Sequence, residues 1–398
     1  MDFRYDVCVV GGCGHVGLPL AITFAHRGYR VCIHDLNEAA VATVREGRMP
    51  FLERGAEELL RQVIGRSLEV ANNPALVGQS RFVVVVIGTP VDEHLNPTFH
   101  VMRRFLTDLI PHLCDGQCVV LRSTVYPGTT AKVRDLLAAS GKDVSVAFCP
   151  ERVAEGHAME ELTVLPQIIS GCDERAVAMA GELFGRIARS LICLSPEEAE
   201  LTKVFTNVWR YIQFATANQF LMIATDHGLD FYRIYEAMTR DYPRMAGLPR
   251  GGFAAGPCLF KDTMQLSAAN NNNFALGHAA MLVNEGLPNF LVRHLKTRHD
   301  LAKLTVGVLG MAFKGESDDP RESLSYKLRK ILDYEAGCCL CTDEFIKDPS
   351  FLPLGEVVDR SDLLIIAAPH AAYRRLAVPE GKPVIDIWNL HGKGTNLT

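Results

Sequence analysis

The chain has 398 residues, which is long enough for two or three domains, and it is 48% hydrophobic and 22% charged. Its net charge of −5 and its lack of basic blocks argue against a nucleic-acid-binding role. The longest apolar runs are too short to cross a bilayer and the N-terminus enters a strand directly. We therefore expect a cytoplasmic protein without a membrane span or signal peptide.

The first expected unit is a strand, a glycine-rich turn, a helix and a second strand. An apolar strand at 7–10 runs into Gly12-x-Gly14-x-x-Gly17, and a strand at 30–34 ends at Asp35. Gly12 permits the tight turn, Gly14 lets the backbone approach a pyrophosphate, and Gly17 lets the helix pack closely. The alternative is a glycine-rich turn without a ligand. Because Asp35 suits a ribose diol and repels a 2′-phosphate, the sequence predicts NAD rather than NADP.

Four further strands are expected, at 81–90, 118–128, 144–153 and 162–171, with helical segments between most of them. Continuous apolar strands that alternate with helices predict a parallel sheet covered on both faces. Ligands bind such sheets at the carboxyl ends of the strands. The polar residues expected at those ends are Thr89, Ser123, Thr124 and Glu151.

A helix of about 30 residues is expected to start at Ser195 or Pro196 and to end near Gly228. Its length, roughly 45 Å, suits a backbone that links two domains and a dimer surface. A second strand–helix–strand unit follows from residue 304 and lacks GxGxxG. The predicted fold is therefore α/β, with two Rossmann-like domains whose parallel sheets are joined by a long helix and a helical dimerisation region.

Cys258 lies in "GGFAAGPCLFKDTMQL", residues 251–266, where glycines and small residues let a ligand approach the backbone. A helix that starts near Cys258 would stabilise a thiolate through its positive end. A thiolate beside a nicotinamide predicts a thiohemiacetal that is oxidised to a thioester and then hydrolysed. Such a cycle needs an oxyanion stabiliser, and Lys203 and Asn207 share one face of the expected long helix. The alternatives are a buried packing cysteine and two solvated helix residues.

Most of the 12 cysteines lie in apolar segments, among them Cys8, Cys32, Cys149 and Cys193. We expect these to pack as reduced thiols. The cluster Cys338, Cys339 and Cys341 lies in an expected strand and lacks the spacing and the partner pair of a zinc site, so no metal site is expected.

Seven segments in order make the chain similar to the UDP-glucose/GDP-mannose 6-dehydrogenase family. They are "GGCGHVGLPLA", "GTPVDE", "STVYPGTT", "CPERVAEG", "AELTKVFTNVWR", "GPCLFKDT" and "GMAFKGESDDPRES". The resemblance implies oxidation of a sugar C6 alcohol to a carboxylate with two NAD⁺, in a homodimer formed through the helical middle. It implies an NAD-binding Rossmann domain at 1–195, a helical dimerisation and catalytic-cysteine region at 196–298, and a nucleotide-sugar-binding domain at 299–398.

The catalytic residues implied by the resemblance are Cys258, Lys203, Asn207, Asp262, Thr124 and Glu151. Cys258 would be the nucleophile, and Lys203 and Asn207 would stabilise the oxyanion and orient C6. Asp262 would activate or position the water, with Thr124. Glu151 would act as a base or shape the sugar site, so the identity of the hydrolytic base stays open.

The resemblance also assigns the ligand contacts. The implied NAD residues are Gly12, Gly14, His15, Val16, Gly17, Asp35, Thr89, Thr124 and Arg321. The implied substrate residues are Glu151, Arg152, Lys203, Asn207, Arg244, Phe253, Gly256, Phe313 and Lys314. Among these, Phe313 and Lys314 would hold the nucleotide diphosphate, Arg321 would reach the NAD pyrophosphate, and Phe253 would lie in the loop over the sugar.

Several residues depart from the family pattern. Ala255-Gly256-Pro257-Cys258 replaces the Gly-Gly-x-Cys of many relatives, and Asn218-Gln219 replaces an Asn-Glu pair, a departure that by itself predicts nothing about function. The Lys-Asp pair after the cysteine resembles UDP-glucose enzymes, whereas "YPRMAGLPRGGF", with Arg244, resembles the N-acetylhexosamine branch. The favoured substrate is a UDP-N-acetylhexosamine, with UDP-glucose next and the sugar left open.

Three alternatives remain. A GDP-mannose 6-dehydrogenase would use the same chemistry. A two-electron hydroxy-acid dehydrogenase would need neither the cysteine nor the second α/β domain, and a nucleotide-sensing regulatory protein would use the fold without catalysis. Measuring NADH formation with UDP- and GDP-sugars distinguishes them.

Overall fold

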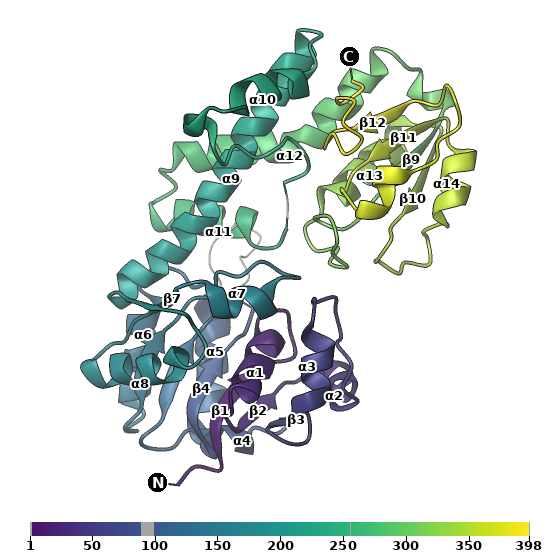
Figure 1. The fold of residues 1–398 in the computed structure, drawn as a ribbon. Helices are drawn as coiled ribbons and strands as arrows, with labels where there is room; N and C mark the ends of the chain where they lie inside the picture. Colours follow the sequence, from purple (N-terminus) through teal and green to yellow (C-terminus); the bar gives the residue numbers. More distant parts are fainter. Residues whose placement is uncertain (1, 89–98, 255, 398) are drawn as a thin grey trace. The chain divides into compact units, whose positions relative to one another are not determined.

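The computed structural model describes residues 2–88, 99–254 and 256–397 (Figure 1). Two compact units are present, Met1–Thr206 and Asn207–Thr398. Their boundary lies within the long helix α9 (Pro196–Asp226). The three functional ranges expected from the sequence stay a prediction.

The first unit contains a six-stranded parallel sheet in the order β3-β2-β1-β4-β5-β6, which is the strand order of a dinucleotide-binding fold. Its strands are β1 (Tyr5–Val10), β2 (Val31–His34), β3 (Leu68–Ala71), β4 (Ser80–Val85), β5 (Cys118–Leu121) and β6 (Ser145–Phe148). Val10 at the end of β1 pairs with His34 of β2 and Val85 of β4. The carboxyl ends of these three strands therefore lie at one edge, as the prediction of a parallel sheet requires.

Helices cover both faces of this sheet (Figure 1). They are α1 (Gly17–His26), α2 (Glu38–Arg45), α3 (Ala56–Val63), α4 (Ala75–Gly78), α5 (Phe99–Leu109), α6 (Thr129–Ala139), α7 (Ala158–Val164) and α8 (Glu174–Gly185), with the short 3₁₀ helix η1 (Ile110–His112). Val7 and Val9 of β1 pack with α1, α3 and α8, whereas Cys8 and Val10 pack with α4, α5 and α6. This alternation follows from the period of two in a strand, and it confirms the doubly covered sheet.

Some expected strands were too long. Residues 162–164 end helix α7, and only Gln167–Ile169 form β7, which pairs with β8 (Leu191–Cys193). Pro166 separates the two elements because proline disfavours a helical conformation in the residue before it. The strands expected at 81–90, 118–128 and 144–153 end at Val85, Leu121 and Phe148, so residues 86–88, 122–128 and 149–153 form loops at the edge of the sheet. Cys193 is exposed, so the prediction that it packs in the core was wrong.

Helix α9 begins and ends where the sequence predicted. Ser195 Oγ accepts a 3.3 Å hydrogen bond from the Glu198 N–H, and Glu198 Oε2 accepts a 2.8 Å bond from the Ser195 N–H. This reciprocal pair is a capping box. Gly228 has a φ of +68° and the Leu229 N–H donates to Ala224 O at 2.8 Å, which closes the last turn. None of the described helices is long and apolar enough to cross a membrane.

The second unit contains a four-stranded parallel sheet in the order β10-β9-β11-β12. Its strands are β9 (Thr305–Leu309), β10 (Cys338–Thr342), β11 (Leu363–Ile366) and β12 (Val384–Asp386). Its further helices are α10 (Phe231–Thr239), α11 (Leu259–Ala269), α12 (Ala275–Lys296), α13 (Leu324–Glu335) and α14 (Leu354–Arg360), with η2 (Pro243–Met245), η3 (Leu301–Lys303) and η4 (Ala371–Arg375). The second Rossmann-like sheet and the strand through the cysteine cluster are as predicted.

Candidate functional site

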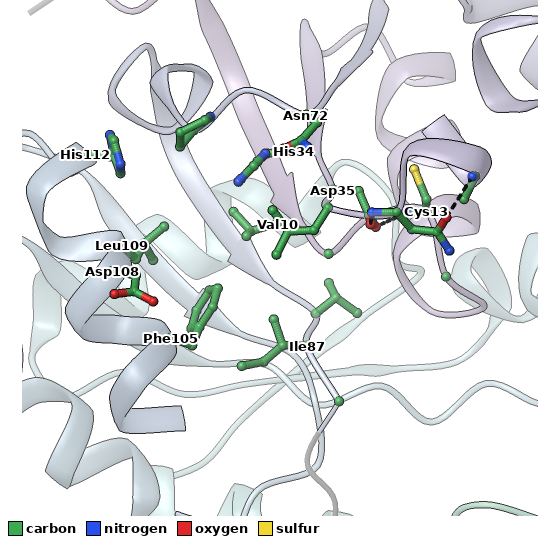
Figure 2. Close-up of a pocket in the computed structure, with 18 residues that line it drawn as sticks. Val10, Cys13, His34, Asp35, Asn72, Ile87, Phe105, Asp108, Leu109 and His112 are labelled. Carbon is green, nitrogen blue, oxygen red and sulfur yellow. Dashed lines mark hydrogen bonds between the residues drawn. The ribbon is translucent and has the colours of Figure 1, made fainter. Parts of the chain in front are cut away.

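A cavity of about 710 Å³ lies at the carboxyl edge of the six-stranded sheet (Figure 2). Its walls come from the glycine-rich loop after β1, the end of β2, the loop after β4, and helix α5. Figure 2 shows Cys13 and Asp35 beside each other, and Phe105, Asp108 and His112 across the cavity from them. The position is the one in which this strand order binds a dinucleotide.

The glycine-rich loop has the close packing that the sequence predicted. A Cβ on Gly17 would lie 2.6 Å from the Gly12 Cα, and a Cβ on Gly12 would lie 2.9 Å from the Val9 carbonyl oxygen. Gly14, by contrast, is exposed and has nothing within 4 Å of its Cβ direction. The loop is therefore packed tightly beneath and open at Gly14, where a pyrophosphate can approach the backbone. Val16 directly precedes α1.

Asp35 lies half-buried at the edge of the cavity. Its Oδ2 accepts a 2.8 Å hydrogen bond from the Cys13 N–H and its Oδ1 accepts a 2.9 Å bond from the Asn37 N–H. Each oxygen keeps a further lone pair for a ribose hydroxyl. A 2′-phosphate would meet the negative charge of Asp35, so the residues present fit NAD. The His15 ring lies against the Phe51 ring, with 4.0 Å between centroids.

Two more polar residues, Thr89 and Thr124, were also expected to be functional. Thr124 lies half-buried in the loop after β5, and the neighbouring Ser123 Oγ donates a 2.6 Å hydrogen bond to Ile87 O after β4. This bond ties the two loops together. Thr89 lies outside the described residues.

Glu151 is buried and its carboxylate is held on both oxygens. Oε2 forms an ion pair with Arg122, a fully buried residue at the end of β5. Oε1 accepts hydrogen bonds from the backbone N–H groups of Arg152 (2.7 Å) and Val153 (3.0 Å). Arg122 Nη1 also donates to Gln167 Oε1 at 2.8 Å. Arg122 was not predicted as a site residue, although its position directly after an apolar strand, at the edge where ligands bind, is visible in the sequence.

The cysteine segment belongs to the second unit. Cys258 is exposed and directly precedes helix α11, and the Asp262 N–H donates to Cys258 O at 2.9 Å. Asp262 is fully buried, and its Oδ2 accepts a 2.6 Å hydrogen bond from Asn207 Nδ2. Lys261 Nζ lies 3.3 Å from Asp262 Oδ1. A helix therefore starts at the thiol, as predicted, and Asn207 and Asp262 are bonded to each other.

The loop before Cys258 packs on the second sheet. Gly256 has a φ of +113°, and a Cβ there would lie 2.7 Å from the Phe313 ring. Lys314 Nζ lies 5.6 Å from the centroid of the same ring. Phe253 is buried in the hydrophobic core of the second unit.

The remaining site candidates come from other segments of both units. Arg321 pairs with Asp319 in the second unit, with its Nε 2.9 Å from both carboxylate oxygens. Arg244 is exposed on η2, where its guanidinium lies 5.6 Å from the Tyr242 ring centroid. Lys203 is half-buried on α9 in the first unit, and Arg152 is half-buried after β6.

Asp343 occupies the position in the second sheet that Asp35 has in the first, directly after the second strand of the unit. Its Oδ2 accepts from the backbone N–H groups of Met311 (2.6 Å) and Ala312 (3.0 Å) and lies 3.2 Å from His370 Nε2. Its Oδ1 accepts from two more backbone N–H groups, at 2.8 and 2.9 Å. Because its oxygens are already bonded to these five groups, Asp343 fixes the loop after β9 and is not suited to bind a ribose.

Comparisons with known proteins agree with this geometry. Residues 5–188 match the NAD binding domain of the UDP-glucose/GDP-mannose dehydrogenase family, and residues 197–286 match its central domain. A UDP-N-acetyl-D-mannosamine dehydrogenase from Methanocaldococcus jannaschii is 29% identical over 92% of this chain and 86% of its own.

Two solved structures are similar over almost the whole chain. The UDP-D-ManNAc dehydrogenase of Pyrococcus horikoshii has a TM-score of 0.89 at 27% identity and covers 99% of this chain and 96% of its own. A UDP-glucose dehydrogenase of Pyrobaculum islandicum has a TM-score of 0.88 at 28% identity, with coverages of 97% and 94%.

Proposed function

Because the chain belongs to the UDP-glucose/GDP-mannose dehydrogenase family of NAD-dependent oxidoreductases, we propose that it oxidises the C6 alcohol of a UDP-sugar to the uronic acid through a covalent intermediate on Cys258. The observation that carries the proposal is the start of helix α11 at an exposed thiol, with the Asn207–Asp262 pair one turn further on. Family membership sets aside the regulatory-protein and hydroxy-acid alternatives.

The loop of Gly12, Gly14 and Gly17 would hold the cofactor pyrophosphate, and Asp35 would bind a ribose. Bound NAD⁺ accepts the two electrons and the hydrogen removed from C6 in each oxidation. Overall, one alcohol, two NAD⁺ and one water give one carboxylate, two NADH and three protons.

Cys258 Sγ bonds to the carbonyl carbon of the C6 aldehyde, the C=O double bond becomes single, and the thiol proton passes to the aldehyde oxygen, which gives a thiohemiacetal. The second oxidation converts this adduct to a thioester. Water then attacks the carbonyl carbon, the C–S bond breaks, and the thiol is restored. The aldehyde stays bonded to the protein in this scheme, so two NADH form for each sugar that is released.

Asn207 can serve two groups at once. One hydrogen of its Nδ2 is donated to Asp262 Oδ2, and the other remains for the oxygen on C6. As the family resemblance implies, Lys203 would supply a second donor to that oxygen, and this donor carries a positive charge. Asp262 Oδ1 forms an ion pair with Lys261, 3.3 Å away, but accepts no hydrogen bond in the described chain. Asp262 is thus the better candidate for orienting the water, whereas Glu151 is held by Arg122 and would shape the sugar site.

The favoured sugar is an N-acetylhexosamine, with UDP as the nucleotide. Support comes from the similarity to UDP-N-acetyl-D-mannosamine dehydrogenases and from the Arg244 stretch of the sequence. The similarity to a UDP-glucose dehydrogenase keeps UDP-glucose as the second candidate. NADH formation with a panel of UDP- and GDP-sugars tests this. Two NADH per molecule of one UDP-N-acetylhexosamine support the proposal, and one NADH per sugar, or activity with GDP-mannose alone, contradicts it.

We also propose a homodimer formed through the helical part of the second unit. Helix α9 exposes Trp209, Phe220 and Ile223, and α12 exposes Leu276 and Leu282, with Trp209 60% exposed. Large apolar side chains in such numbers are typical of an interface between subunits. Light scattering of the purified protein tests this, and a monomer at micromolar concentration contradicts it. Because the described cysteines are free thiols, we propose a cytoplasmic location.

A further inference from the structure

Asn218 lies fully buried on helix α9, eleven residues after Asn207. Its Oδ1 accepts a 2.8 Å hydrogen bond from the Gly252 N–H. Its Nδ2 donates to Asn284 Oδ1 on α12 at 2.9 Å, and Asn284 Nδ2 donates in turn to Tyr211 O at 3.1 Å. These bonds fix the orientation of both side-chain amides. Exchanging the oxygen and nitrogen of either amide would place a donor against a donor or an acceptor against an acceptor. Asn218 Oδ1 is therefore the atom that accepts a hydrogen bond from the loop that precedes Cys258.

The backbone at 251–254 has little freedom apart from this bond. A Cβ on Gly251 would lie 2.6 Å from Leu221 Cδ1, and a Cβ on Gly252 would lie 2.5 Å from the Trp388 ring. Gly252 also has a φ of +150°, a conformation that only glycine adopts readily. On the other side, Tyr232 Oη lies 3.1 Å from Gly251 O and 2.7 Å from Ile387 O. The segment is thus held between α9, α10 and the end of β12.

This segment leads directly into the nucleophile. Gly252 is six residues before Cys258, and Gly256 lies against the Phe313 ring on the way. Asn207 and Asn218 lie on the same face of helix α9, three turns apart. One rigid element therefore holds Asp262, which follows the cysteine, and Gly252, which precedes it.

We propose that Asn218 is a positioning residue for the reaction, one that fixes the loop before Cys258 against helix α9 through the Gly252 N–H. The inference rests on the proposed function, in which Cys258 is the nucleophile. Asn218 bonds to Gly252 and Asn284, so the proposed effect on catalysis passes through the backbone of the loop. Without its acceptor the Gly252 N–H is buried and unpaired, which favours local opening of the loop.

The test compares Asn218→Ala with a matched control, Asn284→Ala. The control also removes a buried amide from the same chain of hydrogen bonds, but it leaves the acceptor of the Gly252 N–H in place. Gln219→Ala, an exposed change next to Asn218, is the surface control. Three readouts are taken: the thermal midpoint, kcat and KM per folded enzyme, and hydrogen exchange of the Gly252 amide.

We expect Asn218→Ala to lower kcat by about 10- to 100-fold, because a displacement of about 1 Å at a reacting group costs up to about 100-fold. Exchange of the Gly252 amide should rise by at least about tenfold. Asn284→Ala should lower the thermal midpoint as much and change kcat by less than about threefold. Asn218→Ser, too short to reach Gly252, replaces the alanine variant if that variant does not fold.

Two results would overturn the inference: an unchanged Gly252 exchange rate in Asn218→Ala, or equal losses of kcat in the two asparagine variants. The second result would mean that both amides act only through general stability. The exchange measurement needs no substrate. If the wild-type protein oxidises no nucleotide sugar, the proposed function fails while the hydrogen-exchange result still decides whether Asn218 holds the loop.

Discussion

Asn207 donates a 2.6 Å hydrogen bond to Asp262, the residue one helical turn after Cys258. The bond fixes the carboxylate on a buried side of α11 and leaves one N–H of Asn207 for a substrate oxygen. The bond joins the proposed donor to the oxygen on C6, Asn207, to the residue proposed to orient the hydrolytic water, Asp262.

The first prediction concerns Asp262→Asn, which keeps the shape of the side chain and removes its charge. Hydrolysis of the thioester should slow by about 100-fold or more, because the water loses its orienting carboxylate. The oxidation steps should persist, so stopped-flow mixing with NAD⁺ and substrate should show a burst of two NADH per active site followed by a slow phase. A slow phase as fast as wild-type turnover contradicts the role of Asp262.

The second prediction concerns the buried pair of Arg122 and Glu151. Glu151→Gln should lower the free energy of unfolding by about 3–5 kcal/mol, because it leaves the buried guanidinium without its counter-charge. Arg81→Met breaks a surface pair with Glu182 and should cost less than about 1 kcal/mol. Urea unfolding measures both. If Glu151 shapes the site, the folded Glu151→Gln protein should release acid without a burst of NADH. A burst of NADH like that of Asp262→Asn would instead make Glu151 the hydrolytic base.

The third prediction concerns cofactor choice at Asp35. Asp35→Ser should weaken NAD⁺ binding by about tenfold and strengthen NADP⁺ binding, because it removes a negative charge beside the ribose. The shorter serine side chain also replaces the carboxylate that accepts from the Cys13 N–H. Asp108→Asn, across the same cavity, removes one charge at a different place and should leave the preference unchanged. Calorimetric titration with both dinucleotides checks the pair. Equal changes in the two variants would mean that only the net charge of the cavity matters.

The fourth prediction concerns the dependence of stability on pH. Burial lowers the pKa of His34 from its ordinary value of 6.5. The unfolded chain therefore binds more protons at this residue than the native protein does, and the free energy of unfolding falls as the pH drops through about 6.5. In His34→Gln this contribution is absent. The wild-type protein should therefore lose more of its free energy of unfolding than the variant does from pH 7 to pH 5.5, so any stability advantage of the wild type should shrink or reverse. Urea unfolding at several pH values measures it, and a constant difference contradicts the prediction.

Local patterns predicted much of this molecule because they act over short stretches. The order of strand, glycines, helix, strand and Asp35 indicated the first sheet and its cavity. Ser195 and Gly228 marked the ends of α9, and the cysteine was placed at a helix start. These features depend on neighbouring residues alone.

The features that the sequence did not predict depend on contacts between residues that are far apart in the chain. Arg122 meets Glu151 only because β5 and β6 lie side by side, and Asn218 meets Gly252 across 34 residues. The strand expected at 162–171 was shortened by Pro166 and by the end of α7. Asn207 and Asp262 were each identified, but their bond spans 55 residues and could not be read from either segment.

The most direct test of the account is product analysis with Cys258→Ser. A serine hydroxyl is a far weaker nucleophile than a thiolate, so acid formation from the UDP-sugar should be lost while the variant still binds NAD⁺ and UDP-sugar. Chromatography of the products should then show no uronic acid and at most an aldehyde-level species held by the protein. Uronic acid at the wild-type rate, with two NADH for each sugar, would show that C6 never becomes bonded to the side chain at position 258.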